Sequence, residues 1–260
     1  MYWFLLLVPL ALLAWGIMEA RYALKVRTHE LGTRGVRIVW ASDFHCRWWY
    51  PPSCIRRIAD RIASLNPDIV IFGGDFVDAG EQYVDACIGE LSRAGGSTLT
   101  AAVLGNHDIQ WSRGSCPRNR IVSRLEQAGI RLLHNASVTE TVRGIPVQII
   151  GTADLSRDVS YIGHLAQDPK AQLVILASHN PDFVPLADTL PFDVALCGHT
   201  HGGQITFFGI PVTTHTRHRR SLGRGRCSFA GRTVIVSFGT GTTILPIRFC
   251  AQPGLDVIDL

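Results

Sequence analysis

The chain lacks internal repeats and low-complexity segments, which excludes solenoid and fibrous architectures. Its seven cysteines are an odd number with no Cys-x-x-Cys pair, which is typical of a reducing compartment and gives no sign of a thiolate zinc site. No long basic surface is evident, and the net charge is only +4. These absences disfavour a disulfide-stapled secreted domain and a general nucleic-acid binder.

Five short polar clusters, each following an apolar run, occur along the chain in a fixed order. They are Asp43-Phe44-His45, Gly73-Gly74-Asp75, Gly105-Asn106-His107-Asp108, Ser178-His179-Asn180-Pro181 and Gly198-His199-Thr200-His201. Carboxylate, imidazole and amide oxygen suit Mn²⁺, Fe²⁺ or Zn²⁺, whereas a structural zinc site would favour thiolates. The set fits two adjacent metal ions, and two ions a few Å apart can clamp a phosphate and activate water.

The apolar runs are short, continuous and rich in Val, Ile and Leu, as expected of strands buried on both faces. They cover residues 36–42, 68–72, 97–104, 172–177 and 193–197. Helical stretches over 53–65, ended by Pro67, and over 81–94 separate the first three runs. This alternation predicts an α/β fold, in which ligands gather beyond the carboxyl ends of strands. We therefore expect one sheet to bring all five clusters to one rim.

Each of these residues, taken singly, also has an ordinary explanation. An Asp or Asn after a strand is commonly a turn residue or a helix cap, and a His in a loop is commonly solvated. Asp78 is either a residue supporting the metal ligands or the N-cap of a helix over 79–87, and Asp182 is expected to be a cap or turn residue. The metal site is predicted because all five clusters occur together and in order.

The ordered clusters resemble the pattern of the calcineurin-like metallophosphoesterases, which is Asp-x-His, Gly-Asp, Gly-Asn-His-Asp or -Glu, a lone His, and Gly-His-x-His. The resemblance runs from Arg37 to the C-terminus. Residues 74–78, 179–182, 197–204 and 237–249 also resemble a membrane-linked bacterial branch of the family, usually described as phosphodiesterases. This resemblance implies a four-layer αββα sandwich with its site at one edge.

The resemblance implies two divalent metal ions, Mn²⁺, Fe²⁺ or Zn²⁺, and a ligand set for each. The implied ligands are Asp43, His45 and His201 for the first ion, Asn106, His179 and His199 for the second, and Asp75 as a bridge between both. One bridging carboxylate screens the repulsion between two cations and lets them approach closely. Metal coordination lowers the pKa of bound water to about 7, so a hydroxide bridging the ions is the expected nucleophile.

The resemblance also implies catalytic roles for His107 and Asp108. His107 would contact the phosphate and help protonate the leaving oxygen, because imidazole has a suitable pKa. Asp108 would orient His107 by accepting its other N–H. The implied reaction is metal-assisted attack on phosphorus with inversion.

The N-terminus carries a second pattern, a stretch without charge from Tyr2 to Met18. As a helix it spans about 26 Å, near the ~30 Å hydrocarbon core of a bilayer. A cleaved signal peptide would have basic residues before the run and a small-x-small site after it, but no Lys or Arg precedes the run and residues 16–20 are a poor cleavage site. A buried core helix is the third possibility. The pattern favours a single-pass membrane anchor over residues 1–20, a linker over 21–35 and a catalytic domain over 36–260.

Charge around the anchor predicts its orientation. Basic residues follow the apolar run, which under the positive-inside rule places the catalytic domain on the cytoplasmic side of an inner membrane. Beside the clusters lie the aromatic residues Trp48, Trp49 and Tyr50, which either pack internally or contact an apolar substrate or the membrane. Seven basic residues within 215–226 form either a solvated loop or a contact for an anionic substrate or lipid headgroup.

These features predict a membrane-anchored, dimetal-dependent phosphoesterase that acts on a phosphodiester or pyrophosphate. The more specific hypothesis is that its substrate is linked to a lipid. A UDP-diacylglucosamine hydrolase is one such enzyme. One alternative is a nuclease or cyclic-nucleotide phosphodiesterase with the same metals, although no specific nucleic-acid partner is expected. The other is a non-catalytic metal-binding scaffold, which is less favoured because every implied ligand is present.

Overall fold

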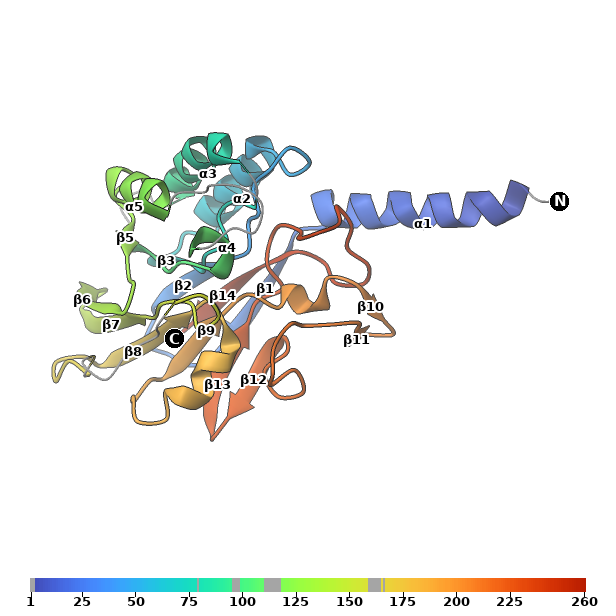
Figure 1. Ribbon diagram of the computed structural model, residues 1–260. Coiled ribbons are helices and arrows are strands. Elements are labelled where there is room, and N and C mark those ends of the chain that lie inside the picture. Colours follow the sequence, from blue (N-terminus) through green and yellow to red (C-terminus); the bar gives the residue numbers. More distant parts are fainter. Residues whose placement is uncertain (1–2, 79, 95–98, 110–117, 159–164, 166) are drawn as a thin grey trace.

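The computed structural model describes residues 3–78, 80–94, 99–109, 118–158, 165 and 167–260. Most of its strands belong to two sheets of six strands each. The first sheet has the order β1-β14-β2-β3-β4-β5 (Figure 1). Its strands are β1 (Lys25–Glu30), β2 (Arg37–Ala41), β3 (Ile69–Phe72), β4 (Leu99–Ala102), β5 (Arg131–Leu132) and β14 (Gly254–Asp259).

The second sheet has the order β12-β13-β9-β8-β7-β6. Its strands are β6 (Ala136–Val142), β7 (Ile145–Gly151), β8 (Leu173–Ser178), β9 (Val194–Cys197), β12 (Gly225–Phe229) and β13 (Arg232–Val236). A small antiparallel hairpin pairs β10 (Thr206–Phe207) with β11 (Ile210–Pro211). The five predicted apolar runs are therefore confirmed as strands β2, β3, β4, β8 and β9.

Most of the α-helices lie on the outer face of the first sheet. The α-helices are α1 (Trp3–Tyr22), α2 (Pro52–Ser64), α3 (Val84–Leu91), α4 (Asn106–Ile109) and α5 (Arg118–Gln127). The 3₁₀ helices are η1 (Glu81–Tyr83), η2 (Ser92–Ala94), η3 (Pro181–Leu186) and η4 (His201–Gly203). The helix predicted over 53–65 is α2, and the one predicted over 81–94 is the run η1-α3-η2.

The expectation that one sheet carries all five clusters is wrong, because the runs divide between two sheets. Strands β2, β3 and β4 are parallel neighbours in the first sheet, and β8 and β9 are parallel neighbours in the second. Short runs buried on both faces are equally compatible with one wide sheet or two stacked ones, so the sequence pattern does not separate these cases. The site lies where the carboxyl ends of both sets meet.

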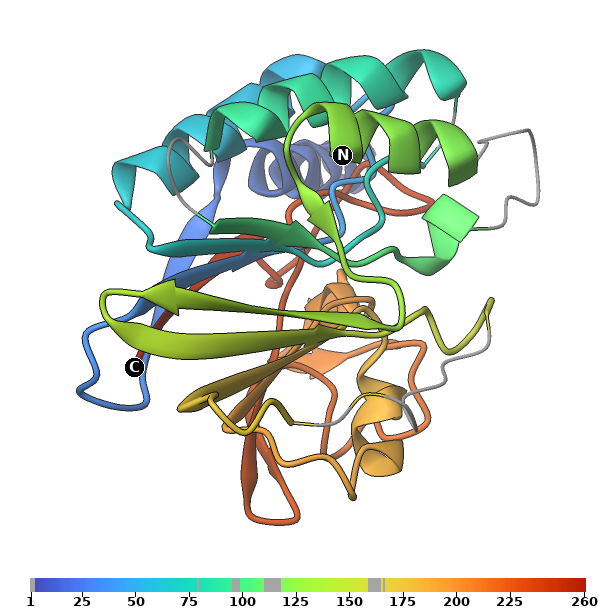
Figure 2. The ribbon, with the colours of Figure 1, turned by 90° about the vertical axis from the view of Figure 1, so that its left-hand side faces the viewer.

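Burial between the sheets holds these edges together. Ile38, Trp40 and Ile71 of the first sheet share a buried cluster with Ile175 and Leu196 of the second. Figure 2 shows the sheets stacked one above the other. The Trp40 indole also donates a hydrogen bond from Nε1 to the carbonyl of Cys197, 3.1 Å away, at the end of β9. This contact ties the end of β2 to the end of β9, where site residues follow both strands.

The outer faces of the two sheets are covered differently. Helices α2, α3 and α5 cover the first sheet (Figure 2), and the apolar side of α2, including Ile55 and Ile58, packs there. Over the described residues, the second sheet is covered by η3 and loops, without an α-helix. The fold is therefore an α/β sandwich of mixed sheets, and its fourth layer, so far as it is described, is a 3₁₀ helix with loops.

The N-terminal segment joins the domain in a way the sequence pattern does not reveal. Part of the predicted linker 21–35 is strand β1, which pairs in parallel with β14 at the edge of the first sheet. Helix α1 projects outward from the body (Figure 1), and its last turns contact the segment before β14. Arg248 N–H donates to the Gly16 carbonyl at 3.0 Å, and the Glu19 carboxylate accepts the Ala251 N–H at 2.9 Å.

The outward part of α1 carries exposed apolar side chains. They are Leu7, Val8, Leu10, Leu12, Leu13, Trp15 and Met18. Within the described part of the chain, no helix combines the length and the apolar character needed to cross a bilayer.

The inter-sheet core gives the first testable prediction. Replacing Ile175, which is fully buried between the sheets, by Ala leaves a cavity and should lower the free energy of unfolding by about 2–5 kcal/mol. The matched control Ile210→Ala removes the same atoms from a side chain that is 72% exposed and should change it by less than about 0.5 kcal/mol. Denaturant unfolding measures both, and equal effects would contradict the proposed role of the inter-sheet core.

Candidate metal centre

The predicted ligands meet at the carboxyl ends of β2, β3, β4, β8 and β9. Five of them have a left-handed backbone, which non-glycine residues seldom adopt: Asp43 (φ 57°), His45 (φ 45°), Asp75 (φ 54°), His199 (φ 68°) and His201 (φ 52°). Each such residue costs on the order of 1–3 kcal/mol and persists only where the surroundings enforce it. Five of the fourteen non-glycine residues with positive φ in the described part of the chain therefore gather at this place, as is typical of functional sites.

The first group of predicted ligands is Asp43, His45 and His201. Their ligand atoms all lie within 4.8 Å of one another. The Nε2 atoms of His45 and His201 are 3.1 Å apart, and His201 Nε2 lies 3.5 Å from Asp43 Oδ1. Burial lowers the pKa of His45 to about 3 and holds that of His201 well below its ordinary value. Both imidazoles are therefore neutral at pH 7, the form that binds metal.

The second group is Asn106, His179 and His199, and it converges on the Asn106 side chain. Asn106 Oδ1 lies 2.9 Å from His199 Nδ1 and 3.2 Å from His179 Nε2. The other nitrogen of His179, Nδ1, is 2.6 Å from the carbonyl oxygen of Gly73, which can only accept. Nδ1 therefore carries a proton, and Nε2 faces the centre. This arrangement is the usual way that a protein orients a metal-binding His.

Asp75 lies between the two groups. Its Oδ2 is 3.4 Å from His45 Nε2 and 3.4 Å from His179 Nε2. Its Oδ1 accepts the His107 backbone N–H at 2.8 Å. Burial alone would lower the pKa of His179, but the Asp75 carboxylate raises it well above its ordinary value. The position beside Asp75 therefore strongly attracts a cation, and the carboxylate is placed to serve both groups.

The chemistry of the donors fits divalent metals. Two imidazole nitrogens that point at one another at 3.1 Å, beside buried carboxylates, form a pocket that a cation satisfies better than a shared proton. The set is nitrogen and oxygen without sulfur, which suits Mn²⁺, Fe²⁺ or Zn²⁺. The residues present therefore fit a two-metal centre, with one group on each side of Asp75.

The structure places Asp108 differently from its expected role beside His107. Its carboxylate accepts three backbone N–H groups, from Asp75 at 2.7 Å, Phe76 at 2.9 Å and Gly105 at 2.9 Å. Burial, with the charge of Asp75, raises the pKa of Asp108 to about 7. Asp108 therefore fixes the backbone of two ligand-bearing loops.

The carboxylate that contacts His107 belongs to Asp78. Asp78 Oδ1 lies 3.0 Å from His107 Nδ1 and 3.6 Å from His45 Nδ1. Its other oxygen pairs with Arg47, whose guanidinium lies over the Trp49 ring at 3.5 Å from the ring centroid. The sequence left Asp78 open between a supporting residue and a helix cap, and the structure places it behind two imidazoles of the centre. The His107 side chain itself is 30% exposed.

Arg248 is a residue that sequence reasoning missed. Its side chain is fully buried, and burial lowers its pKa to about 10, which leaves it charged at neutral pH. It donates to the carbonyls of His201 at 3.1 Å, Ala251 at 2.9 Å, Gly239 at 3.3 Å and Gly241 at 2.6 Å. Arg248 therefore holds the backbone of a ligand loop, and its position in Leu-Pro-Ile-Arg-Phe gave no direct signal of this.

Glycines allow the ligand loops to pack without intervening side chains. A Cβ on Gly105 would overlap Asp75 Oδ1, and a Cβ on Gly198 would lie 2.7 Å from Asp43 Oδ2. Neither glycine has a left-handed backbone, so space alone requires glycine there. The carboxylates of Asp75 and Asp43 thus leave no space for any residue other than glycine at these two motif positions.

Comparisons with known proteins agree with this geometry. A family model described as calcineurin-like phosphoesterase matches residues 36–203. The chain is similar to the uncharacterized metallophosphoesterase YkuE of Bacillus subtilis (strain 168), at 28% identity over 88% of this chain and 80% of that protein. It is similar to the phosphodiesterase YaeI of Escherichia coli (strain K12), at 28% identity over 86% of this chain and 82% of that protein.

A third relative carries a more specific description. The chain is similar to the UDP-2,3-diacylglucosamine pyrophosphatase LpxG of Chlamydia trachomatis serovar D. The two are 26% identical, over 84% of this chain and 82% of that protein.

The glycine packing gives a prediction about metal binding. Gly105→Ala should displace the Asp75 carboxylate and lower metal affinity at least tenfold, because ligand-supporting changes typically cost 10–100-fold. Gly89→Ala is the matched control, since a Cβ there meets nothing within 4 Å inside helix α3. Elemental analysis after dialysis against graded free Mn²⁺ measures both proteins. Unchanged metal content in Gly105→Ala would contradict the assignment of Asp75 as a ligand.

Proposed function

The chain belongs to the calcineurin-like phosphoesterase family, and from this membership we propose that it hydrolyses phosphodiester or pyrophosphate bonds of a membrane-associated substrate. It is a metal-dependent hydrolase of phosphoester bonds, since the family and the phosphodiesterase and pyrophosphatase relatives share that chemistry. Calcineurin-like phosphoesterases use two divalent metal ions, and the His and Asp clusters are suited to hold them. The observation that carries the proposal is Asp75, which lies between two convergent ligand groups.

The proposed ligand assignment follows the two groups. Asp43, His45 and His201 would hold one ion, Asn106, His179 and His199 the other, and Asp75 both. When bound, the ions would polarise the phosphate and supply a hydroxide nucleophile between them at neutral pH. The chain holds their imidazoles neutral or oriented before any metal arrives, through burial of His45 and through the Gly73 carbonyl at His179. Mn²⁺, Fe²⁺ and Zn²⁺ are the candidate ions.

His107 is the proposed proton donor to the leaving oxygen. Asp78 accepts from its Nδ1 at 3.0 Å, which leaves Nε2 as the nitrogen that exchanges a proton with the substrate. The backbone N–H of His107 is fixed on Asp75 Oδ1 at 2.8 Å, so the imidazole is positioned relative to the proposed bridging ligand. Asp108, which fixes the same loop through Gly105, acts as a positioning residue.

Attachment to a membrane is part of the proposal. The apolar side chains of α1 stand exposed outside the body, where an aqueous environment would not stabilise them. Basic residues follow the helix, including Arg21, Lys25 and Arg27, and the positive-inside rule would place the domain on the cytoplasmic side. We propose that α1 anchors the protein to the inner membrane. The substrate would then be presented at the bilayer surface.

Hydrolysis of small diesters tests the catalytic proposal. The protein should hydrolyse bis(p-nitrophenyl) phosphate, lose activity on chelation and regain it with Mn²⁺. His107→Gln should lower kcat by about 10²–10⁴ because it removes the proton donor while metal content stays unchanged. His29→Gln is the control, since His29 lies on edge strand β1 and contacts Asp256 instead of the centre. A folded, metal-loaded protein without activity toward any phosphoester would favour the scaffold alternative.

The lipid-linked form of the proposal has its own test. In mixed micelles the purified protein should cleave UDP-2,3-diacylglucosamine at its pyrophosphate, releasing UMP, with a kcat/KM above that for bis(p-nitrophenyl) phosphate. The support is the similarity to LpxG and the exposed apolar helix. Mass spectrometry of the products identifies the bond that breaks. Good turnover of simple diesters without cleavage of this lipid would remove the specific substrate while leaving the phosphodiesterase assignment.

A further inference from the structure

Two pockets adjoin the metal centre, one on each side of its ligand loop 198–204. The first has a volume of about 390 Å³, and its lining includes His199, Asn180, His215, Arg217 and His218. The second has a volume of about 170 Å³, and its lining includes His201, Ile205, Val212 and Leu245. Two other pockets, around Asp68 and Arg143, lie at the amino ends of β2 and β3, away from every ligand.

The first pocket carries one guanidinium, that of Arg217, and its shape is set by one buried carboxylate that also lines it. Asp182 is 8% exposed, and it accepts hydrogen bonds from Thr216 Oγ1 at 2.5 Å, Arg217 N–H at 2.9 Å and His218 N–H at 3.1 Å. His218 Nδ1 also lies 2.9 Å from Asp182 Oδ1. These bonds fix the loop beside His199. The same bonds use both carboxylate oxygens of Asp182 as acceptors, so its negative charge interacts mainly with N–H and O–H groups of this loop.

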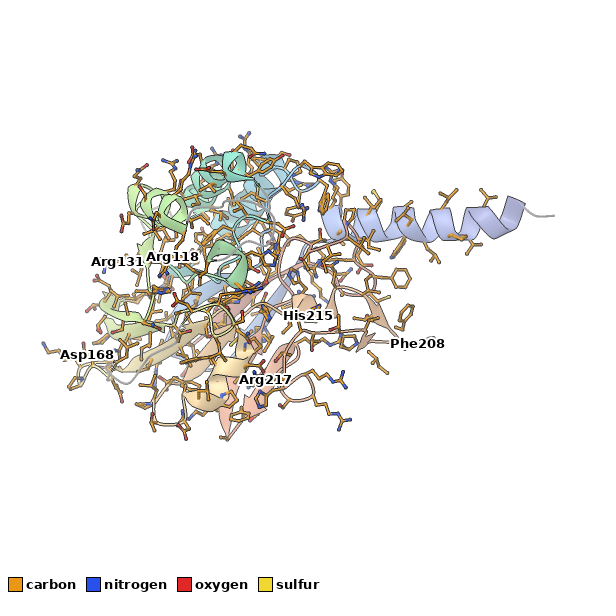
Figure 3. The ribbon with its side chains drawn as sticks, in the orientation of Figure 1. Arg118, Arg131, Asp168, Phe208, His215 and Arg217 are labelled. Carbon is orange, nitrogen blue, oxygen red and sulfur yellow. The ribbon has the colours of Figure 1, made fainter. Side chains whose placement is uncertain are left out.

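The Arg217 side chain supplies a permanent positive charge at this pocket. It is exposed, and among the described residues no ion pair joins its guanidinium to a carboxylate. Figure 3 shows Arg217 and His215 on the same face of the molecule, with Phe208 at the outer edge of the hairpin beneath α1. A guanidinium exposed at this position, in the same pocket as His199, suits a phosphate or carboxylate that is separate from the reacting phosphate.

The second pocket is mainly apolar, and hydrogen bonds from one side chain hold its wall in place. The Gln204 side chain donates from Nε2 to the carbonyls of Thr243 at 3.0 Å and Leu245 at 3.3 Å, and its Oε1 accepts the Thr243 N–H at 2.9 Å. These bonds hold loop 243–245 against the ligand loop and form the pocket wall. Ile244 and Leu245 in that wall are 73% and 48% exposed, so an apolar group bound there would remove apolar surface from water.

We propose that the two pockets select an amphiphilic phosphoester, with its apolar group on the His201 side and a second anionic group on the His199 side. This inference rests on the proposed function, because it takes the reacting phosphate to lie at the metal centre. His215 lines both pockets and separates them. A diester or diphosphate has two substituents that leave its phosphorus in different directions, and the two pockets match such a pair in polarity.

Binding of three phosphate monoesters to the metal-loaded full chain, measured by calorimetry, tests this inference. Ethyl phosphate is the reference, octyl phosphate adds an apolar chain, and 1,2-ethanediol bisphosphate adds a second anion. Octyl phosphate should bind about tenfold more tightly than ethyl phosphate, because one or two further methylenes are buried. The bisphosphate should bind about five- to tenfold more tightly through a charge-assisted bond with Arg217.

Matched variants separate the pockets. Leu245→Ser should abolish the octyl advantage alone, and Arg217→Gln should abolish the bisphosphate advantage alone. The controls are Phe208→Ser and Arg220→Gln, exposed positions of the same kinds that line neither pocket, and both should bind all probes as the wild type does. Equal wild-type affinities for the three probes, or a variant that weakens all probes alike, would overturn the inference. Failure to hydrolyse esters with these preferences intact would count only against the proposed function.

Discussion

The position of Asp75 is the constraint on which the rest of the structure depends. Its carboxylate must reach imidazoles from both sheets, since His45 follows β2 in one sheet and His179 follows β8 in the other. That is possible only if the sheets are stacked with their carboxyl edges in register. The inter-sheet core, with Trp40 bonded to the carbonyl of Cys197, sets this register. The sandwich therefore functions as the frame that brings two half-sites to one carboxylate.

Holding this arrangement opposes local preferences of the chain. Five of the predicted ligands have a left-handed backbone, and several carboxylates and imidazoles are buried together, which costs free energy in each case. Backbone hydrogen bonds from Asp108 and Arg248 offset part of this cost, since each fixes carbonyls or N–H groups of the ligand loops. Metal ions at the centre would offset more, because they compensate the buried carboxylates directly. The site is thus strained, but hydrogen bonds within the protein hold its geometry before any metal ion or substrate binds.

The sequence predicted the strands well, and it identified a set of candidate ligands that the structure brings together, because both have strong local signals. An apolar run followed by Asp-x-His or Gly-Asp is visible without any knowledge of packing, and the structure brings those residues together. The residue pattern alone did not distinguish one sheet from two, because burial on both faces looks the same in either case, whereas the family resemblance implied two sheets. The sequence left Asp78 open between a supporting residue and a helix cap, and Asp108 was expected to contact His107, because Asp108 is adjacent to His107 in sequence whereas Asp78 is adjacent only in space. Asp182 and Arg248 act through backbone groups distant in sequence, which no motif spacing encodes.

One short stretch of chain connects the outward helix with the metal centre. Residues 239–251 contribute carbonyls to Arg248, which also bonds the backbone of His201, and the Arg248 N–H bonds Gly16 of α1. The same stretch contributes Ile244 and Leu245 to the apolar pocket. The helix, the pocket wall and a ligand loop are therefore connected through one stretch of chain. The apolar pocket on the His201 side therefore shares its support with the helix proposed as the membrane anchor, which favours this pocket as the place for an apolar substituent of a membrane substrate.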